Sequence, residues 1–367
     1  MRRILLTVAA MTALATGFLP PGPTAATPGQ TSAIGKQLVL GGLPFPAAFT
    51  FFADGRILYG ERFTGDIRIY DPSNGSNTRF FHVTKLATDG EQGLLGLAVH
   101  PRYPAKPYVY AYATRTINGT LRNQVLRITD SGGTGTAKKV IFSSDTVAGT
   151  YHDGGRILFG PDGMLYAVVG EAHSPANAQD LSNNAGKVLR MTPAGKAPPD
   201  DPFPGTPIFT YGLRNSFGFT FDPQTRKLWE TENGPECNDE INLELSGQNH
   251  AWGPSETCST PPSPPTNTNQ DGPQPRIMPL AFFSPPIAPT GAAFCSGCGL
   301  TGDQGDLFFG AYNTGDIRDV KLTADRTGIS SMSVVYTNAS GILSMERGPD
   351  GALYFSDAGA IDKLVQM

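Results

Sequence analysis

The chain has 367 residues, of which 44 are glycine and 32 are proline, and its formal net charge is −4. This glycine and proline content suits an all-β protein with many tight turns, since both residues are poorly tolerated inside long helices. The charged residues form no dense run of lysine and arginine. The composition therefore argues against nucleic acid as a partner.

The first residues have the pattern of a secretory signal peptide. Met1-Arg2-Arg3 precedes an apolar run from Ile4 to about Leu19, and proline and small residues follow as far as Ala26. The run is too short, and meets proline too early, to predict a membrane span. We predict a signal peptide over residues 1–26, a linker over residues 27–35 and a secreted protein with no membrane span.

A pattern of two strands recurs six times along the rest of the chain. A turn rich in Gly and Asp leads into a short strand of apolar and aromatic residues, and a second strand follows about ten residues later. The six first strands lie near residues 54–59, 107–110, 162–166, 226–229, 305–308 and 350–354. Repeats of this size, built only of strands and tight turns, are typical of propellers. We predict an all-β, six-bladed β-propeller that forms one domain over residues 36–367.

The two ends of this region are predicted to close the ring. The last repeat ends at Met367 directly after its second strand, so the final blade lacks an outer strand. The segment Lys36–Leu40 precedes the first repeat and has the composition of a strand. Pairing the two would complete the blade and remove an open sheet edge. The alternative is that this segment is an unstructured leader.

Three segments carry polar groups that a plain propeller strand does not need. They are Gly90–Pro101, Tyr151–Gly163 and Tyr211–Asn242. In the second segment, His152 precedes a strand and is followed closely by two glycines. A histidine in a loop that faces an axial channel can act as a general base, because its pKa lies near neutrality. The alternative is a turn histidine that bonds to the backbone.

The third segment offers groups for anions and for a metal ion. Arg214 and Asn215 supply a planar cationic fork and an amide, which suit carboxylate or quinone oxygens. An ion pair between blades would explain Arg214 equally well. The carbonyl groups of Gly234 and Pro235 lie in an acidic turn and suit a hard cation such as calcium.

The four cysteines lie in the second half of the chain, at Cys237, Cys258, Cys295 and Cys298. An even number of cysteines in an exported protein favours disulfides. We expect the sequence-local pairs Cys237–Cys258 and Cys295–Cys298. A four-thiolate zinc site is the alternative, although only one Cys-x-x-Cys pair is present.

The three polar segments resemble the glucose/sorbosone dehydrogenase family, whose members are soluble six-bladed propellers related to quinoprotein aldose sugar dehydrogenases. The resemblance runs from about Gly41 to Leu364. The matching motifs are Gln-Gly-Leu-Leu-Gly-Leu-Ala-x-His-Pro from Gln92, His-x-Gly-Gly-Arg-x-x-Phe-Gly-Pro-Asp-Gly from His152, and Tyr-Gly-x-Arg-Asn from Tyr211, followed by Glu-x-Gly-Pro and Asp-Glu-Ile-Asn-Leu.

The resemblance implies an exported enzyme that oxidises an aldose at its anomeric carbon to a lactone. Pyrroloquinoline quinone (PQQ) would be the cofactor, and an external acceptor would take the electrons. By this resemblance His152 would take the hydroxyl proton while hydride leaves the anomeric carbon. Arg214 would stabilise the negative charge that develops at the quinone. Asn215 would hold the cofactor, and Gln92 would orient the sugar.

The same resemblance implies two roles for calcium. The carbonyl groups of Gly234 and Pro235 would bind an ion that polarises the quinone as a Lewis acid. Glu240 would bind a second, structural calcium ion.

The last third of the chain departs from the family pattern. Asn313 stands where the family has a lysine that meets the carboxylates of the quinone, and Gly341-Ile342-Leu343 stands where it has Arg-x-Arg. Each lost charge-assisted hydrogen bond is worth roughly 1.5–3 kcal/mol, so losing three would weaken binding by on the order of three or more decades. Arg318, Lys321 and Arg347 are the candidates to compensate.

Two rival functions follow from these departures. The first is a propeller of the same family that has lost PQQ and binds a glycan or a partner protein. The second is a calcium-dependent lactonase, in which the ion and a histidine activate water. The fold alone does not decide between them, because one scaffold hosts many functions.

Overall fold

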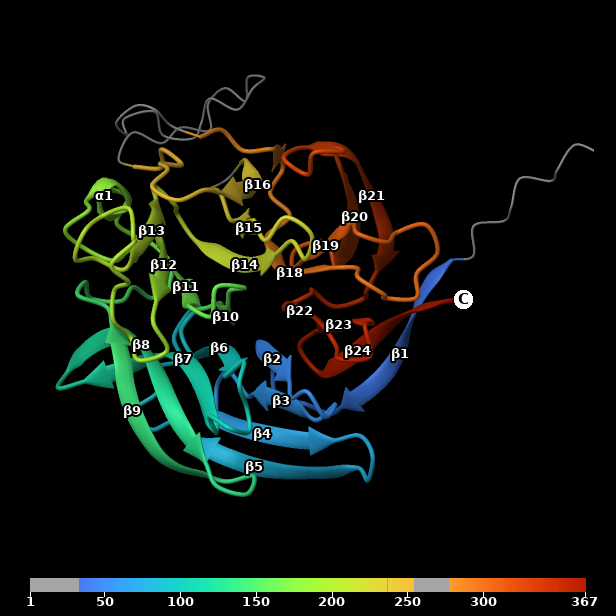
Figure 1. Ribbon diagram of the computed structural model, residues 1–367, viewed down its shortest axis with the longest axis horizontal. Helices are drawn as coiled ribbons and strands as arrows, with labels where there is room; N and C mark the ends of the chain where they lie inside the picture. Colours follow the sequence, from blue (N-terminus) through green and yellow to red (C-terminus); the bar gives the residue numbers. More distant parts are fainter. Residues whose placement is uncertain (1–32, 236, 254–276) are drawn as a thin grey trace, which may run out of the picture. The chain divides into compact units, whose positions relative to one another are not determined.

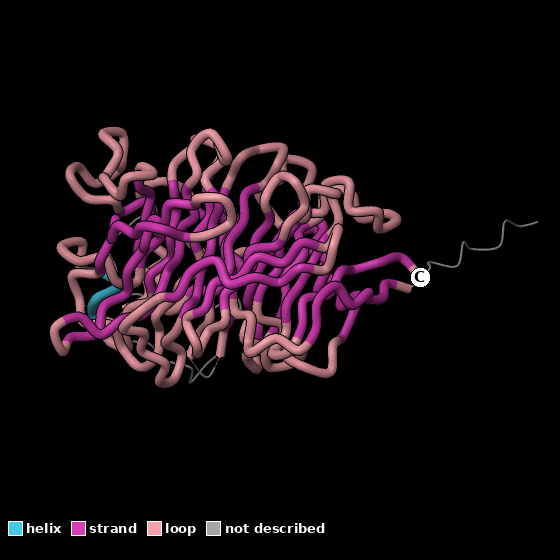
Figure 2. Tube along the Cα trace, turned by 90° about the horizontal axis from the view of Figure 1, so that it is seen from below, coloured by secondary structure: helices cyan, strands magenta, loops and turns pink. Residues whose placement is uncertain are grey.

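A computed structural model of the chain describes residues 33–235, 237–253 and 277–367. Within these residues, six four-stranded antiparallel sheets stand around a common centre (Figure 1). The six-bladed β-propeller predicted from the repeats is therefore confirmed. A side view shows the strands crossing the thickness of the ring, with loops at both faces (Figure 2).

The first three blades each consist of four strands that are consecutive in the sequence. Blade 1 contains β2 (Ala48–Phe51), β3 (Ile57–Gly60), β4 (Asp66–Asp71) and β5 (Ser76–His82). Blade 2 contains β6 (Leu94–Val99), β7 (Tyr108–Ile117), β8 (Thr120–Asp130) and β9 (Gly135–Ser143). Blade 3 contains β10 (Ile157–Phe159), β11 (Leu165–Val169), β12 (Lys187–Met191) and β13 (Ile208–Tyr211). A short helix, α1 (Ala176–Gln179), lies in the loop between β11 and β12.

The last three blades continue this order, except that the final blade takes one strand from the other end of the chain. Blade 4 contains β14 (Ser216–Phe221), β15 (Leu228–Glu232), β16 (Asp239–Glu244) and β17 (Ala281–Phe283). Blade 5 contains β18 (Pro289–Phe294), β19 (Leu307–Ala311), β20 (Asp316–Leu322) and β21 (Ile329–Thr337). Blade 6 contains β22 (Ser344–Arg347), β23 (Leu353–Ser356), β24 (Ala360–Gln366) and β1 (Ile34–Gly41).

The core of the protein lies between neighbouring blades. All residues of β11, β15 and β19 are buried, whereas the outer strands β5 and β9 expose most of theirs. Inner strands pack against a blade on each side. Burial between the blades removes their side chains from water, and this favours apolar residues at nearly every position. This explains why the repeats read as short continuous apolar runs.

The pairing of β1 with β24 closes the ring, as the sequence predicted. The two strands are antiparallel, with Ile34 opposite Gln366 and Gly41 opposite Ala360. The Lys36 ammonium lies 2.8 Å from the buried carboxylate of Asp362 and donates to Asn338 Oδ1 at 3.0 Å. β1 begins at Ile34, two residues inside the predicted linker.

Some of the sequence predictions concern residues outside those that the structure describes. The predicted signal peptide lies entirely outside the described residues, so it remains a prediction. The secreted location of the protein also remains a prediction. In the described part of the chain, no helix is long and apolar enough to span a membrane.

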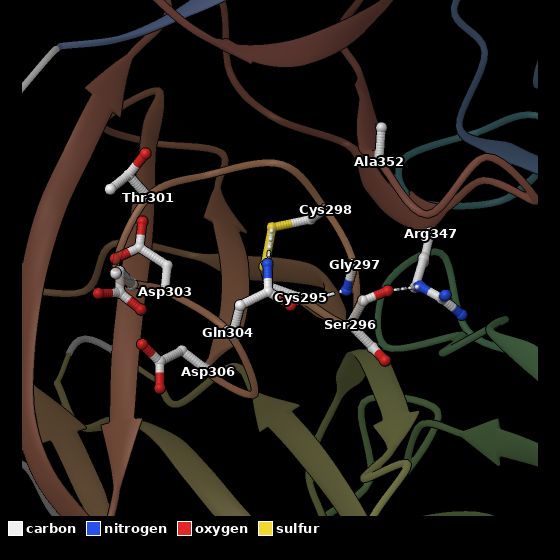
Figure 3. Close-up of a disulfide and its surroundings, with 12 residues drawn as sticks. Cys295, Ser296, Gly297, Cys298, Thr301, Asp303, Gln304, Asp306, Arg347 and Ala352 are labelled. Atoms are coloured by element: carbon white, nitrogen blue, oxygen red, sulfur yellow. Dashed lines mark hydrogen bonds between the residues drawn. A yellow bond between two sulfur atoms is a disulfide. The ribbon is translucent and has the colours of Figure 1, made fainter.

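One of the two predicted disulfides is present. Cys295 is bonded to Cys298 in the loop between β18 and β19 (Figure 3). Gln304 Oε1 accepts a hydrogen bond from Gly297 N at 2.8 Å, and Arg347 Nε donates to Ser296 O at 2.7 Å. The loop is thereby attached to blade 6. The other predicted pair, Cys237–Cys258, includes a residue outside the described ranges.

We expect the ion pair at the ring closure to stabilise the fold measurably. Lys36→Met leaves the fully buried Asp362 carboxylate without its ammonium, which should cost about 1–3 kcal/mol of unfolding free energy in denaturant titrations. Lys363→Met is the control, because Lys363 forms an exposed pair with Asp350 that is worth about 0–1 kcal/mol. Equal stability of the two variants would show that the Lys36 pair does not hold the ring closed.

Candidate functional site

A cavity of about 530 Å³ lies at one end of the central channel. Its walls include residues just before or at the beginning of the innermost strands, among them Ala47, Arg156, Phe217, Thr290 and Leu343. A second cavity, of about 320 Å³, is lined by residues at or beyond the opposite ends of four of these strands. The innermost strands therefore run in the same direction, from the first cavity, which we call the site cavity, to the second.

An ion pair separates the two cavities. Arg156 precedes β10 in blade 3 and lines the site cavity, whereas Glu346 lies on β22 in blade 6 and lines the second one. The Arg156 guanidinium bonds to the Glu346 carboxylate and donates to Met345 O at 2.8 Å. Burial raises the pKa of Glu346, and the charge of Arg156 opposes that shift. The pair links blades on opposite sides of the ring.

His152 lies in the loop before β10, where a carboxylate fixes its ring. Its Nδ1 is hydrogen-bonded to Glu171, which follows β11, and both side chains are buried. A carboxylate at Nδ1 favours the tautomer that carries its proton on Nδ1, and this tautomer leaves Nε2 as the nitrogen that can accept a proton. The geometry thus suits a general base.

Glu91 joins His152 to Asn215. One oxygen of its carboxylate accepts from the backbone N–H of His152 at 2.8 Å and from Asn215 Nδ2 at 2.9 Å. Asn215 Oδ1 in turn accepts from Gly154 N at 3.2 Å. A Cβ atom at Gly170 would lie 2.2 Å from His152 O and 2.9 Å from Asn215 Oδ1, so only glycine allows this approach. Side chains of blades 2, 3 and 4 are held together here.

Arg214 lies beside the backbone of the predicted metal-binding turn. Its Nη1 donates to Asn233 O at 2.9 Å and to Gly234 O at 2.7 Å, and the guanidinium lies over the ring of Trp252. Glu232 accepts from the backbone N–H groups of Arg214 and Asn215. The carbonyl of Arg214 accepts from Glu171 N at 2.8 Å, which ties this turn to the partner of His152.

The predicted metal ligands line one small cavity of about 20 Å³. Gly234, Pro235 and Glu240 all contribute to its wall, together with Glu232. Within the described ranges, no hydrogen-bond donor meets the buried Oε2 of Glu232. Burial raises the pKa of Glu232 to about 7 and that of Glu240 well above its usual range. The volume exceeds the roughly 10–15 Å³ that one water molecule needs. Two carboxylates and backbone carbonyls around such a space suit a single hard cation.

Gln92 does not use its side chain at the cavity wall. Its Nε2 donates to Gly149 O at 2.7 Å, its Oε1 accepts from Asp89 N at 3.3 Å, and the residue is buried. Its neighbours Gly90 and Glu91 line the cavity instead. In this arrangement the amide of Gln92 fixes the loop that carries Glu91.

The departures from the family pattern lie at the cavity itself, since Asn313 and Leu343 both line it. The three cations suggested to compensate are engaged elsewhere. Arg318 pairs with Asp316 at 3.1 Å, Lys321 with Asp306 at 2.9 Å, and Arg347 lines the second cavity.

Four charged residues contribute to the site although the sequence did not predict a role for them. Glu91 and Glu232 stand within the motifs, but nothing in their spacing distinguishes them from solvent-facing carboxylates. Glu171 follows a strand and belongs to no recognisable motif. Arg62 lies in the first repeat, which was used only to predict the fold. Their roles depend on contacts between blades.

The chain is similar in sequence and structure to sugar dehydrogenases. A sequence model of the family "Glucose / Sorbosone dehydrogenase" matches residues 43–366. Quinoprotein glucose dehydrogenase B of Acinetobacter calcoaceticus is 32% identical over 283 residues, which is 68% of this chain and 58% of that protein.

Two solved structures share the fold. A putative oxidoreductase (glucose dehydrogenase) of Thermus thermophilus is 32% identical, with a TM-score of 0.78 over 91% of this chain and 100% of that one. The PQQ-bound aldose sugar dehydrogenase of Streptomyces coelicolor is 27% identical, with a TM-score of 0.77 over 92% of this chain and 99% of that one.

We expect Glu91 to be essential for the assembly of the site. Glu91→Ala removes two charge-assisted hydrogen bonds and should lower the unfolding free energy by about 2–4 kcal/mol. Glu91→Gln keeps an oxygen that can accept both bonds and should cost less than half as much. The comparison is made by denaturant unfolding, and the bridging role is wrong if alanine and glutamine have the same effect.

Proposed function

The chain belongs to the glucose/sorbosone dehydrogenase family, and we propose that it is a sugar dehydrogenase that oxidises an aldose at its anomeric carbon to a lactone. PQQ is the proposed cofactor, calcium the proposed metal ion, and an external acceptor takes the electrons. The observation that supports this most directly is the contact network that joins His152, Asn215 and Arg214 to Glu91. Glu91 lines the site cavity, Arg214 lines the small cavity, and His152 and Asn215 are buried behind Glu91.

The residues present at the cavity fit a planar, anionic cofactor. A volume of about 530 Å³ lies within the usual range of ligand pockets, roughly 300–1,000 Å³. The wall supplies the Arg62 guanidinium and the amide of Asn313. It also carries the Glu91 carboxylate, which accepts a hydrogen bond from the buried Asn215 amide. When bound, PQQ supplies the two-electron acceptor for the sugar.

In the proposed reaction His152 acts as general base. Its Nε2 takes the proton of the anomeric hydroxyl while that carbon loses a hydride, so the aldose becomes a lactone. The Glu171 carboxylate stabilises the imidazolium that forms, because it is already hydrogen-bonded to Nδ1. Arg214 supplies fixed positive charge beside the reacting atoms.

Calcium would be held by the carbonyl groups of Gly234 and Pro235 and by the carboxylates of Glu232 and Glu240, which line the same small cavity. A divalent ion would offset the cost of burying these carboxylates without a full set of partners. Export is part of the same proposal. The Cys295–Cys298 disulfide supports it, since disulfides persist in oxidising compartments.

The second candidate is a non-redox propeller that binds a glycan or a protein. Asn313 and Leu343 at the cavity wall favour it, because they remove charge that a tricarboxylate needs.

A dye-reduction assay tests the proposal. Mature protein with PQQ and calcium should reduce an artificial electron acceptor when glucose or another aldose is added. His152→Gln should lower kcat by roughly 10²–10⁴-fold and leave PQQ binding unchanged. The control is His82→Gln, since that side chain is half exposed and pairs with Asp66 on blade 1. Neither dye reduction nor a change in PQQ absorbance, even at high micromolar PQQ, would favour the non-redox candidate.

Removal of calcium should reduce stability as well as activity. At a free concentration of 100 times its Kd, a bound ion adds about 2.7 kcal/mol to the unfolding free energy, so chelation should lower the melting temperature. Glu240→Gln should abolish most of that response. The matched control is Glu61→Gln, a change of the same kind in blade 1. If the melting temperature of the wild-type protein does not respond to calcium, no calcium site exists here.

A further inference from the structure

Arg62 is held rigidly at the wall of the site cavity. It follows β3 in blade 1, and its Nε donates to Gln92 O at 3.1 Å while Nη2 donates to Gly90 O. The guanidinium carbon lies 5.2 Å from the ring centre of Phe45 and 4.7 Å from that of Phe63. The backbone is fixed too, because Arg62 O accepts from Leu94 N at 3.0 Å.

The half-buried guanidinium of Arg62 forms no close ion pair, although the carboxylates of Glu91 and Asp153 act on its charge from farther away. Within the described ranges, no carboxylate oxygen lies within 4.0 Å of its guanidinium, whereas Arg156 in the same wall is paired with Glu346. Burial lowers the pKa of Arg62, yet a guanidinium stays protonated in proteins. A partly desolvated cation without an ion pair is costly unless an anion joins it.

The remaining donors of Arg62 suit a carboxylate. The two backbone carbonyls use two of its five N–H groups, so part of the planar fork is still available. That fork matches carboxylate geometry, and its fixed position means that little side-chain entropy is lost on binding. Asn313 and Leu343, in the same cavity, carry no charge.

We propose that Arg62 binds a carboxylate of the anionic cofactor and takes over part of the role of the cations that are missing at Asn313 and Leu343. This inference rests on the proposed function, because it presumes that PQQ enters the site cavity. Arg62 is a binding residue in this scheme and takes no part in proton transfer.

Direct binding of PQQ tests the proposal without reference to turnover. The Kd of PQQ for the full calcium-loaded chain is measured by calorimetry or fluorescence quenching. Arg62→Gln should raise this Kd roughly 10–100-fold, the loss of one charge-assisted hydrogen-bonded contact. Arg79→Gln should leave it unchanged, since that side chain is exposed on β5. Arg62→Lys should give an intermediate Kd, because it keeps the charge and loses the fork.

Rescue separates a binding role from a structural one. Asn313→Lys, added to Arg62→Gln, restores a cation to the same cavity and should recover at least threefold of the lost affinity. Asn313→Lys alone is the control: its gain in affinity should be smaller in the presence of Arg62 than in Arg62→Gln, and an equal gain in both would contradict the idea that Arg62 takes over the role of the missing cation. If Arg62→Gln fails to fold, Arg62→Lys decides alone, and a Kd equal to that of the wild type overturns the proposal.

The remaining outcomes distinguish this inference from the function on which it rests. PQQ binding to the wild type and to Arg62→Gln with the same Kd overturns the role of Arg62 and leaves the sugar dehydrogenase proposal standing. No PQQ binding by the wild type at high micromolar concentration overturns both.

Discussion

The pairing of β1 with β24 is the constraint on which the rest of the structure depends. Each blade buries its inner strands only because a neighbour covers it on both sides, so an open ring would expose two sheet faces at once. The same closure brings the beginnings of the innermost strands to one cavity. Residues that are far apart in the sequence, such as Arg62 and Leu343, thereby share a wall.

Within that ring, ion pairing determines which charged side chains at the site remain available to interact with a ligand. Arg156 is neutralised by Glu346, whereas Glu91 keeps its charge, because the His152 backbone and the Asn215 amide are neutral donors. Arg62 and Arg214 instead bond to backbone carbonyls, which do not cancel their charge. Charges of both signs therefore remain at the site, even though Asn313 and Leu343 are uncharged.

The features of the fold that depend on local sequence patterns could be predicted from the sequence. Short apolar strands at a regular interval predicted the blades, and the composition of Lys36–Leu40 predicted the closing strand. The predicted pair Cys295–Cys298 is only three residues apart. In contrast, the bond from Glu91 to Asn215 spans 124 residues, and Glu171 meets His152 across a loop that no motif marks. Such contacts arise from the packing of blades, which periodicity does not encode.

The Arg156–Glu346 pair affects how small molecules can reach the site cavity. Arg156 lines the site cavity and Glu346 lines the second cavity, so the ion pair stands between the two and favours access to the proposed site from the side of the site cavity. In the proposed enzyme, the lactone would leave by the opening through which the sugar entered, and the electron acceptor would use the same opening afterwards. The proposed function, combined with a single opening, therefore predicts ping-pong kinetics, in which the lactone leaves before the electron acceptor binds.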